Sequence, residues 1–374
     1  MTEYESLFRD HCCARGFPCK SNTDVTTSNP KLLFNISGGV PLEGAIAGEE
    51  KPVEARAASI QRCIRTDAWP KIGVSGRHHI AFDMLGHFSL YELPEEACKE
   101  LMIGLAWTYA TERVGIRPDR LHATVHPEDT VTQSIWNGLG VRTVVQAENV
   151  SAEPRGKRTG LRSEIVWRRQ DGTYLELWNL VFHQFEGAGE SRRPIPLIAA
   201  DSGMSLDRLV TAAEEAPTNY ENSLWVVPIE AIRAIAPTAD PHTIYRLADM
   251  AKAAACMAAS GVKPGNKVSA YVLRRVIREA CMIARNSGIN STEVLQAGVN
   301  HWLVGQPEEF GIRQAITGEA DKFNGCLERG EKEAKKLLVK NGGTFTDGDY
   351  ALLAETYGYP REMAAALVGG ASGG

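Results

Sequence analysis

The hydrophobic pattern of the chain changes near residue 236, and this change limits the possible folds more than any other feature. Before it, apolar, aromatic and β-branched residues alternate in short runs, most clearly over 174–185 (YLELWNLVFHQF). Strict alternation places neighbouring side chains on opposite faces of a strand. Beyond Pro241 the chain is rich in alanine and has helical spacing. We therefore predict an α+β domain over 1–236 and an all-helical domain over 237–374.

Several further segments have a predictable secondary structure. Arg120–His126 is expected to be a strand of the first domain. In the second domain, helices are expected over Leu247–Ser260, Val268–Ala284 and Glu319–Lys340. Gly261 and Pro264 fall between the first two of these helices, where they indicate a turn.

The overall composition excludes some classes of protein. The chain has 41 lysines and arginines against 46 acidic residues, a net charge of −5. Dedicated nucleic-acid binders are usually basic, so any RNA contact is expected to be a local patch. There is no apolar stretch of about 18 residues and no N-terminal signal pattern, so we expect a cytoplasmic protein without a membrane partner. Cys12, Cys13 and Cys19 lack a matching histidine set and are expected to be reduced thiols rather than a zinc site.

The first group of candidate functional residues lies in 62–65 (RCIR) and 77–84 (RHHIAFDM). These segments are expected to form two antiparallel strands joined by a polar loop. Arginine offers a planar fork of donors to phosphate oxygens, and an aromatic ring can stack on adenine, so the pair could form the floor of a nucleotide site. The alternative is a surface hairpin with incidental charge.

A second group lies in Asp201–Arg208 (DSGMSLDR). We predict a glycine-containing turn that runs into an apolar helix, whose N-terminus would favour anions. Asp201 could pair with an ammonium group, and Arg208 with phosphate or an adenine face. The alternative is an ordinary N-terminal cap followed by a helix with charged side chains at i,i+4 spacing.

A third group is formed by Glu164, Glu176 and Asn179 on strand-like segments. Carboxylates that face arginines suggest a magnesium–nucleotide site, although exposed strand carboxylates without a function are common. His122 and His126 have an HxxxH spacing, but on a strand-like segment. We therefore expect packing or surface histidines there, and no metal other than magnesium.

Taken together and in this order, the segments resemble the alanyl-tRNA synthetase family of class II synthetases. The resemblance is carried by six stretches: 32–35 (LLFN), 61–90 (QRCIRTDAWPKIGVSGRHHIAFDMLGHFSL), 178–185 (WNLVFHQF), 201–209 (DSGMSLDRL), 259–278, which contains YVLRRVIR, and 354–360 (AETYGYP). It spans nearly the whole chain. It implies an antiparallel class II sheet flanked by helices, followed by a helical domain like the family's tRNA-recognition domain.

The resemblance also implies roles for individual residues. The nucleotide would be ATP, with magnesium. Arg65 and Arg208 would be the catalytic arginines that hold its phosphates, and Phe82 would stack on adenine. The implied ATP-binding set is Arg65, Arg77, His79, Phe82, Glu164, Glu176 and Arg208. Asp201 would receive the ammonium group of alanine, and the implied amino-acid-binding set is Asn179, Val181, Asp201 and Gly203. Asn266 and Glu355 stand at the family's positions for contact with tRNA, or with another acceptor.

The departures from the family pattern bear on the acceptor and on the amino acid. The editing and C-terminal oligomerising domains have no counterpart, so a truncated, monomeric form is expected. The loop of 61–90 is several residues shorter than in the family. Basic residues are lost after Arg278, and Glu355 replaces an aspartate. Phosphate neutralisation dominates RNA affinity, so these losses should weaken tRNA binding.

The family's pocket tryptophan is missing, the segment 159–162 (TGLR) replaces its cysteine-containing turn, and Gly39 replaces a methionine.

These observations lead to a main hypothesis and an alternative. The main hypothesis is a ligase of specialised metabolism. It would activate L-alanine, or a similarly small amino acid such as glycine or serine, and transfer it to a small-molecule acceptor. The alternative is a minimal alanyl-tRNA ligase, which retention of the helical domain and Asn266 favours. A non-catalytic binding protein would have no physical need to keep Arg65, Phe82, Asp201 and Arg208 together.

Overall fold

The computed structural model describes residues 1–151, 158–187, 189–303 and 309–370. By contacts, the chain divides into two compact units, Met1–Glu230 and Ala231–Gly374. The first is built on a β-sheet and the second from helices, so the predicted α+β and all-helical architectures are confirmed. The contact boundary falls within helix α6 (Val226–Ile235), directly after which the composition changes.

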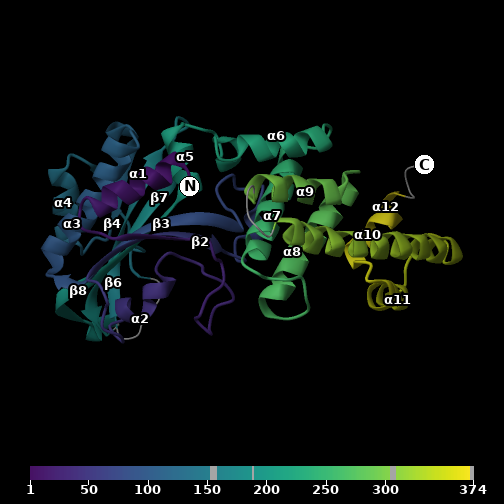
Figure 1. Cartoon of the computed structure of the whole chain (residues 1–374), viewed down its shortest axis with the longest axis horizontal. Helices are drawn as coiled ribbons and strands as arrows, with labels where there is room; N and C mark the ends of the chain where they lie inside the picture. Colours follow the sequence, from purple (N-terminus) through teal and green to yellow (C-terminus); the bar gives the residue numbers. More distant parts are fainter. Residues whose placement is uncertain (152–157, 188, 304–308, 371–374) are drawn as a thin grey trace. The chain divides into compact units, whose positions relative to one another are not determined.

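One eight-stranded mixed sheet organises the first unit, in the order β1-β2-β3-β8-β7-β6-β4-β5 (Figure 1). The edge pairs β1–β2 and β4–β5 are parallel, and all other neighbours are antiparallel. The strands are β1 (Cys19–Asn22), β2 (Arg56–Ile64), β3 (Ala81–Leu93), β4 (Leu121–Val125), β5 (Arg142–Val145), β6 (Arg158–Arg168), β7 (Tyr174–Glu186) and β8 (Arg193–Ser205). The predicted strands over 120–126 and 174–185 are thereby confirmed as β4 and β7.

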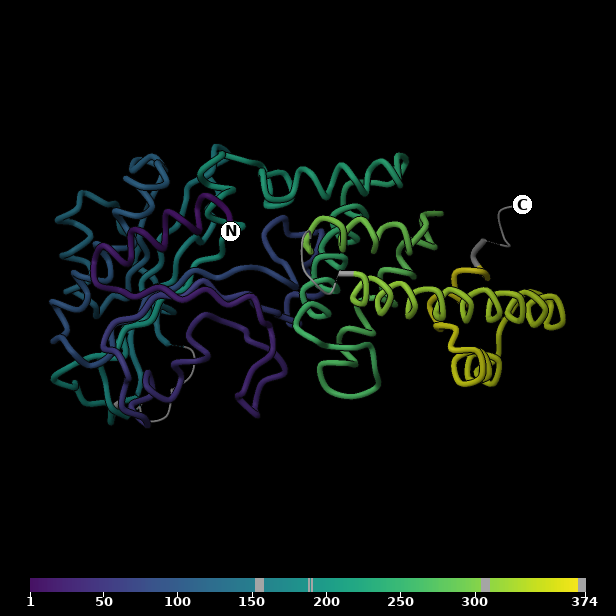
Figure 2. Tube along the Cα trace, viewed as in Figure 1, coloured from purple at the N-terminus to yellow at the C-terminus, as the bar shows by residue number. Residues whose placement is uncertain are grey.

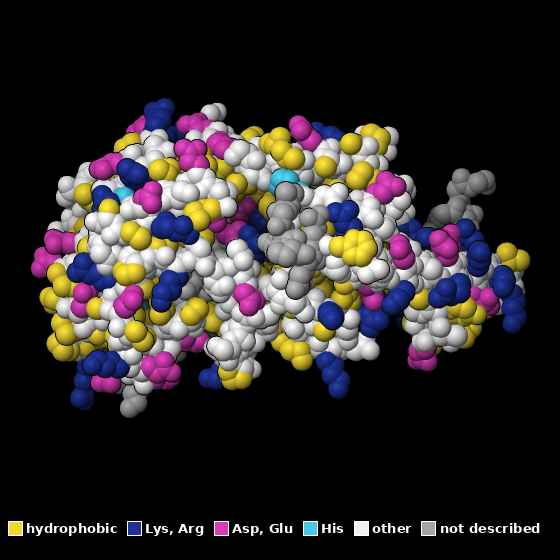
Figure 3. Space-filling model, in the orientation of Figure 1, with side chains coloured by type: hydrophobic (Ala, Val, Ile, Leu, Met, Phe, Trp, Pro, Cys, Tyr) yellow, Lys and Arg dark blue, Asp and Glu magenta, His cyan; other side chains and the backbone are white. Residues whose placement is uncertain are grey.

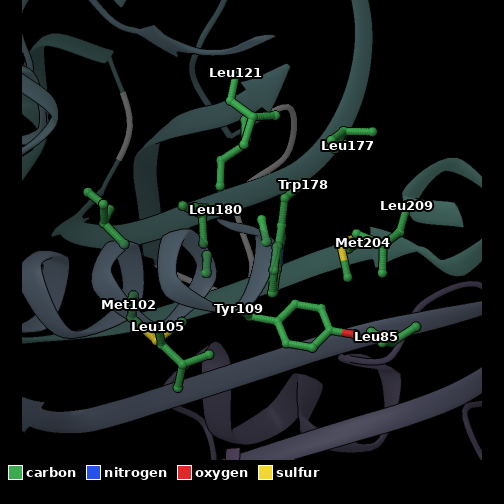
Figure 4. Packing of buried hydrophobic residues seen from close by; sticks show 14 of the residues in the cluster. Leu85, Met102, Leu105, Tyr109, Leu121, Leu177, Trp178, Leu180, Met204 and Leu209 are labelled. Atoms are coloured by element: carbon green, nitrogen blue, oxygen red, sulfur yellow. The ribbon is translucent and has the colours of Figure 1, made fainter. Parts of the chain in front are cut away.

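The alternation of β7 divides the sheet into an apolar face and a polar face. Trp178, Leu180 and Phe182 point into the main core, where they are almost completely buried. Figure 4 shows Trp178 and Leu180 beside Tyr109, with Met102 and Leu105 from the covering helix. The helices that cover this face are α1 (Glu3–Cys13), α3 (Glu95–Thr108) and α5 (Leu206–Ala213). The residues between those of the core, Asn179 and Val181, therefore face the other side.

A buried ion pair joins α3 to α4 (Thr130–Gly138) beneath the apolar face. Lys99 is fully buried, and its Nζ lies 2.7 Å from both Glu95 Oε1 and Asp129 Oδ1. Asp129 also caps α4 by accepting from Thr132 N. Loss of one partner would leave an uncompensated buried charge, which typically costs about 3–5 kcal/mol. The pair thus fixes how these two helices back the sheet.

The second unit is helical over its described residues (Figure 2). Its helices are α7 (Pro241–Ala259), α8 (Val268–Asn286), α9 (Ser291–Trp302), α10 (Glu309–Lys340), α11 (Asp347–Tyr357) and α12 (Arg361–Gly370). The predicted helices exist, but α7 begins before Leu247 because Asp240 caps it and Pro241 takes its first position. Helix α10 likewise begins before Glu319. In the described part of the chain, no helix has both the length and the apolarity to cross a membrane.

Candidate functional site

A cavity of about 410 Å³ lies on the polar face of the sheet, within the first unit. Strands β3, β7 and β8 form its floor, and segments 37–39 and 65–79 form part of its wall. The cavity collects most of the residues singled out from the sequence: Arg65, Arg77, His79, Phe82, Glu176, Asn179, Val181, Asp201, Gly203 and Arg208. Residues that are distant along the chain meet here because β3, β8 and β7 are neighbours in the sheet.

The arginine and aromatic end of the cavity is built on β2 and β3. These strands are antiparallel, as predicted, and the structure places Ile64 opposite Ala81. Arg65 follows β2 directly; its Nε donates to the Ile36 carbonyl oxygen at 2.9 Å, and its guanidinium carbon lies 5.4 Å from the centre of the Phe82 ring. That distance is typical of a cation–π contact, so Arg65 is already positioned beside the aromatic ring.

The connection between β2 and β3 differs from the prediction of a plain polar loop. It contains a short 3-10 helix, Trp69–Lys71, and both Trp69 and Ile72 are buried. Arg77 and His79 were expected on the second strand, but they precede β3, which begins at Ala81. The apolar side chains of the connection pack inward and make it a compact wall of the cavity.

His79 lines the cavity but is mostly engaged by the surrounding protein. Its ring stacks on Trp225, with centroids 4.7 Å apart and planes 14° apart, and its Nε2 lies 3.1 Å from Asn219 Nδ2. The residue is 4% exposed, which leaves little of it for a nucleotide. Its nucleotide-binding role remains a prediction, in which the ring would act mainly as a rigid support.

The neighbouring His78 was not singled out from the sequence, and it also lines the cavity. Burial lowers the pKa of His78 to about 4, assisted by the nearby positive charges of Arg208, Lys71, Arg77 and His79. The imidazole is therefore neutral near pH 7. A neutral ring among cations can hydrogen-bond to a phosphate group without adding charge.

The segment 201–208 corrects one prediction. It is not a glycine turn, because β8 continues through Asp201 and Gly203 to Ser205 and α5 begins at Leu206. Gly203 lies opposite Asn179, and a Cβ atom there would approach Met84 Sδ to 2.9 Å. The glycine thus leaves space for the Met84 side chain of the adjacent strand β3, and it does not serve a backbone turn.

Asp201 lies opposite Val181 on the neighbouring strand β7. It is 8% exposed, and its Oδ1 lies 2.9 Å from Nε2 of His183. The sequence interpretation missed His183. The signal was present, because strand alternation puts His183 on the same face as Val181 and Asn179.

Arg208 and Glu176 also line the cavity and contact each other. Arg208 Nη1 donates to the Glu176 carbonyl oxygen at 3.0 Å and lies 3.2 Å from Glu176 Oε2. In regular alternation Glu176 and Asn179 would face opposite sides. A shift in the β6–β7 register, with Ile165 opposite Trp178 and Val166 opposite Glu176, leaves Leu177 as an extra residue. This β-bulge brings Glu176 to the cavity.

Glu164 stands apart from the residues that line the cavity, although it pairs with Asn179 in register. Its pKa is raised, chiefly by burial and next by the negative charge of Glu176; Arg162, a Thr124 hydrogen bond and Arg208 oppose this. Two carboxylates that repel each other beside an arginine suit a divalent cation that also holds phosphates. Among the described residues, no group of three or more metal-binding side chains is found.

Asn266 and Glu355 belong to the second unit and are both exposed. The Asn266 side-chain oxygen accepts a hydrogen bond from Arg274. Arg274 Nε and Arg278 Nε each lie 2.8 Å from the same Glu319 carboxylate oxygen. The residue expected to contact an acceptor is therefore tied to an arginine–glutamate network.

The two histidines of the HxxxH spacing are packed, as predicted. His122 and His126 are 5% and 9% exposed. The His122 ring centre lies 5.4 Å from that of Tyr174, and His126 Nδ1 accepts from Glu128 N. The segment 159–162, which replaces the family's cysteine-containing turn, belongs to strand β6, where Gly160 packs against the β7 backbone.

Comparison with known proteins gives consistent matches. Residues 17–371 match the family model described as tRNA synthetases class II (A). An alanine–tRNA ligase of Shouchella clausii is 30% identical over 377 residues, which covers 91% of this chain and 42% of the relative. One from Methylococcus capsulatus is 31% identical over 380 residues, which covers 92% and 43%. One from Herpetosiphon aurantiacus is 28% identical and covers 98% and 46%. The chain thus spans less than half the length of these relatives.

Solved structures of synthetases are also similar to part of the chain. Apo histidyl-tRNA synthetase of S. aureus aligns with a TM-score of 0.40 and 11% identity, and covers 59% of this chain and 67% of that one. A pyrrolysyl-tRNA synthetase structure from Desulfitobacterium hafniense aligns with a TM-score of 0.36 and 16% identity, and covers 58% and 70%.

Proposed function

The chain belongs to the class II tRNA synthetase (A) family, and on that basis we propose that it activates L-alanine, or a similarly small amino acid, with ATP. The products are the aminoacyl-adenylate and pyrophosphate. The observation that supports this most directly is one cavity that holds arginines, an aromatic ring and a buried carboxylate. Cations and a ring suit the nucleotide, and the carboxylate suits an amine.

At the nucleotide end, Arg65, Arg77 and Arg208 would bind phosphate oxygens, and Phe82 would stack on adenine. In the structure the Arg65 guanidinium lies over the Phe82 ring, and Phe82 is only 7% exposed. We therefore expect Arg65 to move from the ring to the α-phosphate when ATP binds. That movement would exchange a cation–π contact for a charge-assisted hydrogen bond and uncover the ring face for adenine.

At the amino-acid end, Asp201 would receive the α-ammonium group, while Val181 and Gly203 would enclose the side chain. The register places these groups together, since Val181 is opposite Asp201 and Asn179 is opposite Gly203. Met84 lies over Gly203 and limits the space, which favours a methyl-sized side chain. Asn179 supplies a further polar group at the same place.

The reaction would be an in-line displacement at phosphorus. A carboxylate oxygen of the amino acid forms a bond to the α-phosphorus while the bond from that phosphorus to the bridging oxygen breaks. Pyrophosphate leaves with the bonding electron pair. The protein's contribution is to hold both reactants in position and to place Arg65 and Arg208 where negative charge develops.

Magnesium bound with ATP would supply additional neutralisation of the phosphates and the leaving group. Glu164 and Glu176 would hold it. Burial is the main cause of the raised pKa of Glu164, and repulsion by Glu176 adds to it; a bound cation would relieve that repulsion.

For the acceptor of the aminoacyl group, the relatives favour tRNA. Proteins named alanine–tRNA ligases match 91–98% of this chain, including the helical unit. In this reading the chain transfers alanine to tRNA, and Asn266 contributes to recognition of the acceptor stem.

A specific observation favours a second candidate, a small-molecule acceptor. Glu319 pairs with both Arg274 and Arg278 and so offsets one of their two positive charges, and Arg274 also donates to Asn266. With a net charge of −5, the chain offers little excess positive charge for an RNA backbone. Transfer to a small amine in specialised metabolism would not need such charge.

Alanine-dependent ATP–pyrophosphate exchange without tRNA tests the activation step. We expect exchange by the natural chain, and a loss of at least about 100-fold in Arg65→Ala and Asp201→Ala. Arg117→Ala is the matched control, since Arg117 is exposed and paired only locally with Asp119. Exchange that survives in both site variants would overturn the assignment of the site. Charging of tRNA bearing a G·U acceptor pair, compared with consumption of small amines, then separates the two acceptors.

A further inference from the structure

His183 holds the carboxylate that faces the amino-acid end of the cavity. It lies on β7 opposite Ala199 of β8, next along the same strand face from Val181, whose partner is Asp201. The residue is 1% exposed, and its Nε2 lies 2.9 Å from Asp201 Oδ1. His183 is not among the residues that line the cavity, so it contacts Asp201 from outside the lining.

The environment of the ring indicates which nitrogen carries the proton. The other ring nitrogen, Nδ1, is buried without a hydrogen-bond partner among the described residues. A protonated ring would bury a charged N–H group at that position with no acceptor, which costs more than an unpaired lone pair. The arrangement therefore favours a neutral imidazole with its hydrogen on Nε2, which donates to Asp201.

This hydrogen bond has two consequences for Asp201. A neutral donor adds no positive charge beside the carboxylate, whereas a cationic partner at the same place would compete with the substrate's ammonium group. Oδ1 is also fixed in place before any substrate arrives. A carboxylate held in one orientation does not have to lose rotational freedom when it receives an ammonium group.

We propose that His183 is a positioning residue that orients Asp201 toward the substrate's ammonium group and so sets selectivity for α-amino acids. The inference rests on the proposed function, because it assigns Asp201 to the amine. A hydroxy acid of the same size offers no ammonium charge to the oriented carboxylate, and the site should reject it.

The test compares two substitutions at His183 in the full chain. Glutamine can present its Nε2–H at a similar distance, whereas leucine fills the space without a donor. For His183→Leu we expect the KM for alanine to rise about 10-fold or more, with kcat and the KM for ATP within about 3-fold of the natural values. His183→Gln should restore most of the loss. His122→Leu, another buried histidine away from the cavity, should change neither KM.

A direct binding measurement keeps the inference separate from the activity. Calorimetry with a non-hydrolysable alanyl-adenylate mimic and with AMP should show weaker binding of only the mimic to His183→Leu. Thermal unfolding establishes that each variant is folded. The inference is overturned if the folded leucine variant keeps its KM for alanine, or if affinities for AMP and the mimic fall together. If the natural chain shows no pyrophosphate exchange, but binds the mimic more tightly than His183→Leu does, the proposed reaction is wrong and the inference on His183 stands.

Discussion

Single side chains decide how the cavity is shaped. Gly203 is the clearest case, because the space for its missing Cβ is taken by Met84, a residue from another strand. His183 is another, because it bonds to Asp201 from outside the lining. In both cases the functional effect of a residue depends on a neighbour that is distant in the sequence.

Gly203→Ala should narrow the amino-acid end. The new Cβ would lie 2.9 Å from Met84 Sδ, so the flexible methionine must shift within the cavity that it lines. One methylene-sized change is worth about 1–3 kcal/mol, so kcat/KM for alanine should fall about 10- to 100-fold, and for glycine less. Exchange assays with both amino acids measure this. Adding Met84→Ala should restore alanine use; equal losses for glycine and alanine would contradict the packing account.

Burial of His87 should make the free energy of unfolding depend on pH in the acidic range. Complete burial lowers its pKa to about 3, a hydrogen bond to the Met102 carbonyl opposes this, and His11 adds a small effect in the same direction as burial. Below the unfolded pKa of about 6.5 the unfolded chain takes up a proton that the folded chain refuses. The free energy of unfolding should therefore fall by about 1.4 kcal/mol per pH unit for this group as the pH drops from about 6.5 toward 3.

Urea unfolding at pH 7 and pH 5 checks this expectation. His87→Gln removes the titrating group, so the difference in unfolding free energy between the two pH values should shrink by about 2 kcal/mol. The contribution of His11, whose pKa burial lowers to about 4, remains in the variant. An unchanged difference would mean that His87 is not the group that resists protonation.

At the scale of elements, irregularities position the functional groups. The bulge at Leu177 turns Glu176 toward Arg208, and α5 begins directly where β8 ends, which places Arg208 beside the cavity.

In the helical unit, α8 begins with a strained residue. Val268 has φ +52°, a left-handed conformation that β-branched residues rarely adopt, and it is 65% exposed.

Val268→Gly should stabilise the protein by about 1 kcal/mol. Glycine adopts this φ without steric cost, and the exposed valine side chain contributes little packing. Chemical denaturation gives the change in unfolding free energy. Val268→Ala keeps a Cβ but removes the branching, so it should give a smaller gain. A glycine variant that is less stable than the natural chain would show that the strain is absent.

At the scale of the whole molecule, charge distribution bears on the acceptor. Figure 3 shows both signs interspersed over the visible face, in keeping with the small net charge of −5. In the helical unit, Glu319 is only 7% exposed, and its carboxylate forms ion pairs with two arginines, Arg274 and Arg278. RNA affinity depends on arginines and lysines that neutralise phosphates and release their counterions. An arginine already paired with a carboxylate contributes less to this release.

Glu319→Gln should free Arg274 and Arg278 and strengthen tRNA binding. We expect affinity to increase about 5-fold at low salt, with a steeper salt dependence. Filter binding across a salt series measures both quantities. Glu328→Gln on the same helix is the control, since Glu328 is exposed and its substitution changes the net charge equally. An equal gain in both variants would indicate a net-charge effect alone.

The sequence by itself determined the family, the two kinds of architecture and most of the cavity. Motifs in collinear order identify the family. The strand and helix periods of the hydrophobic pattern predict the two architectures, because periodicity is a local property of the chain. Arg65, Phe82, Asp201 and Arg208 were identified this way, and the structure gathers them in one cavity.

Only the tertiary structure decided which side of each element faces the cavity. Glu176 reaches it through a bulge, Glu164 lies on the same face but outside the lining, His79 stacks on Trp225, and His183 bonds to Asp201. Strand register and bulges depend on partners far away in the sequence, and a shift of one residue exchanges the two faces. Local periodicity contains no information about that pairing, which is why these assignments required the folded sheet.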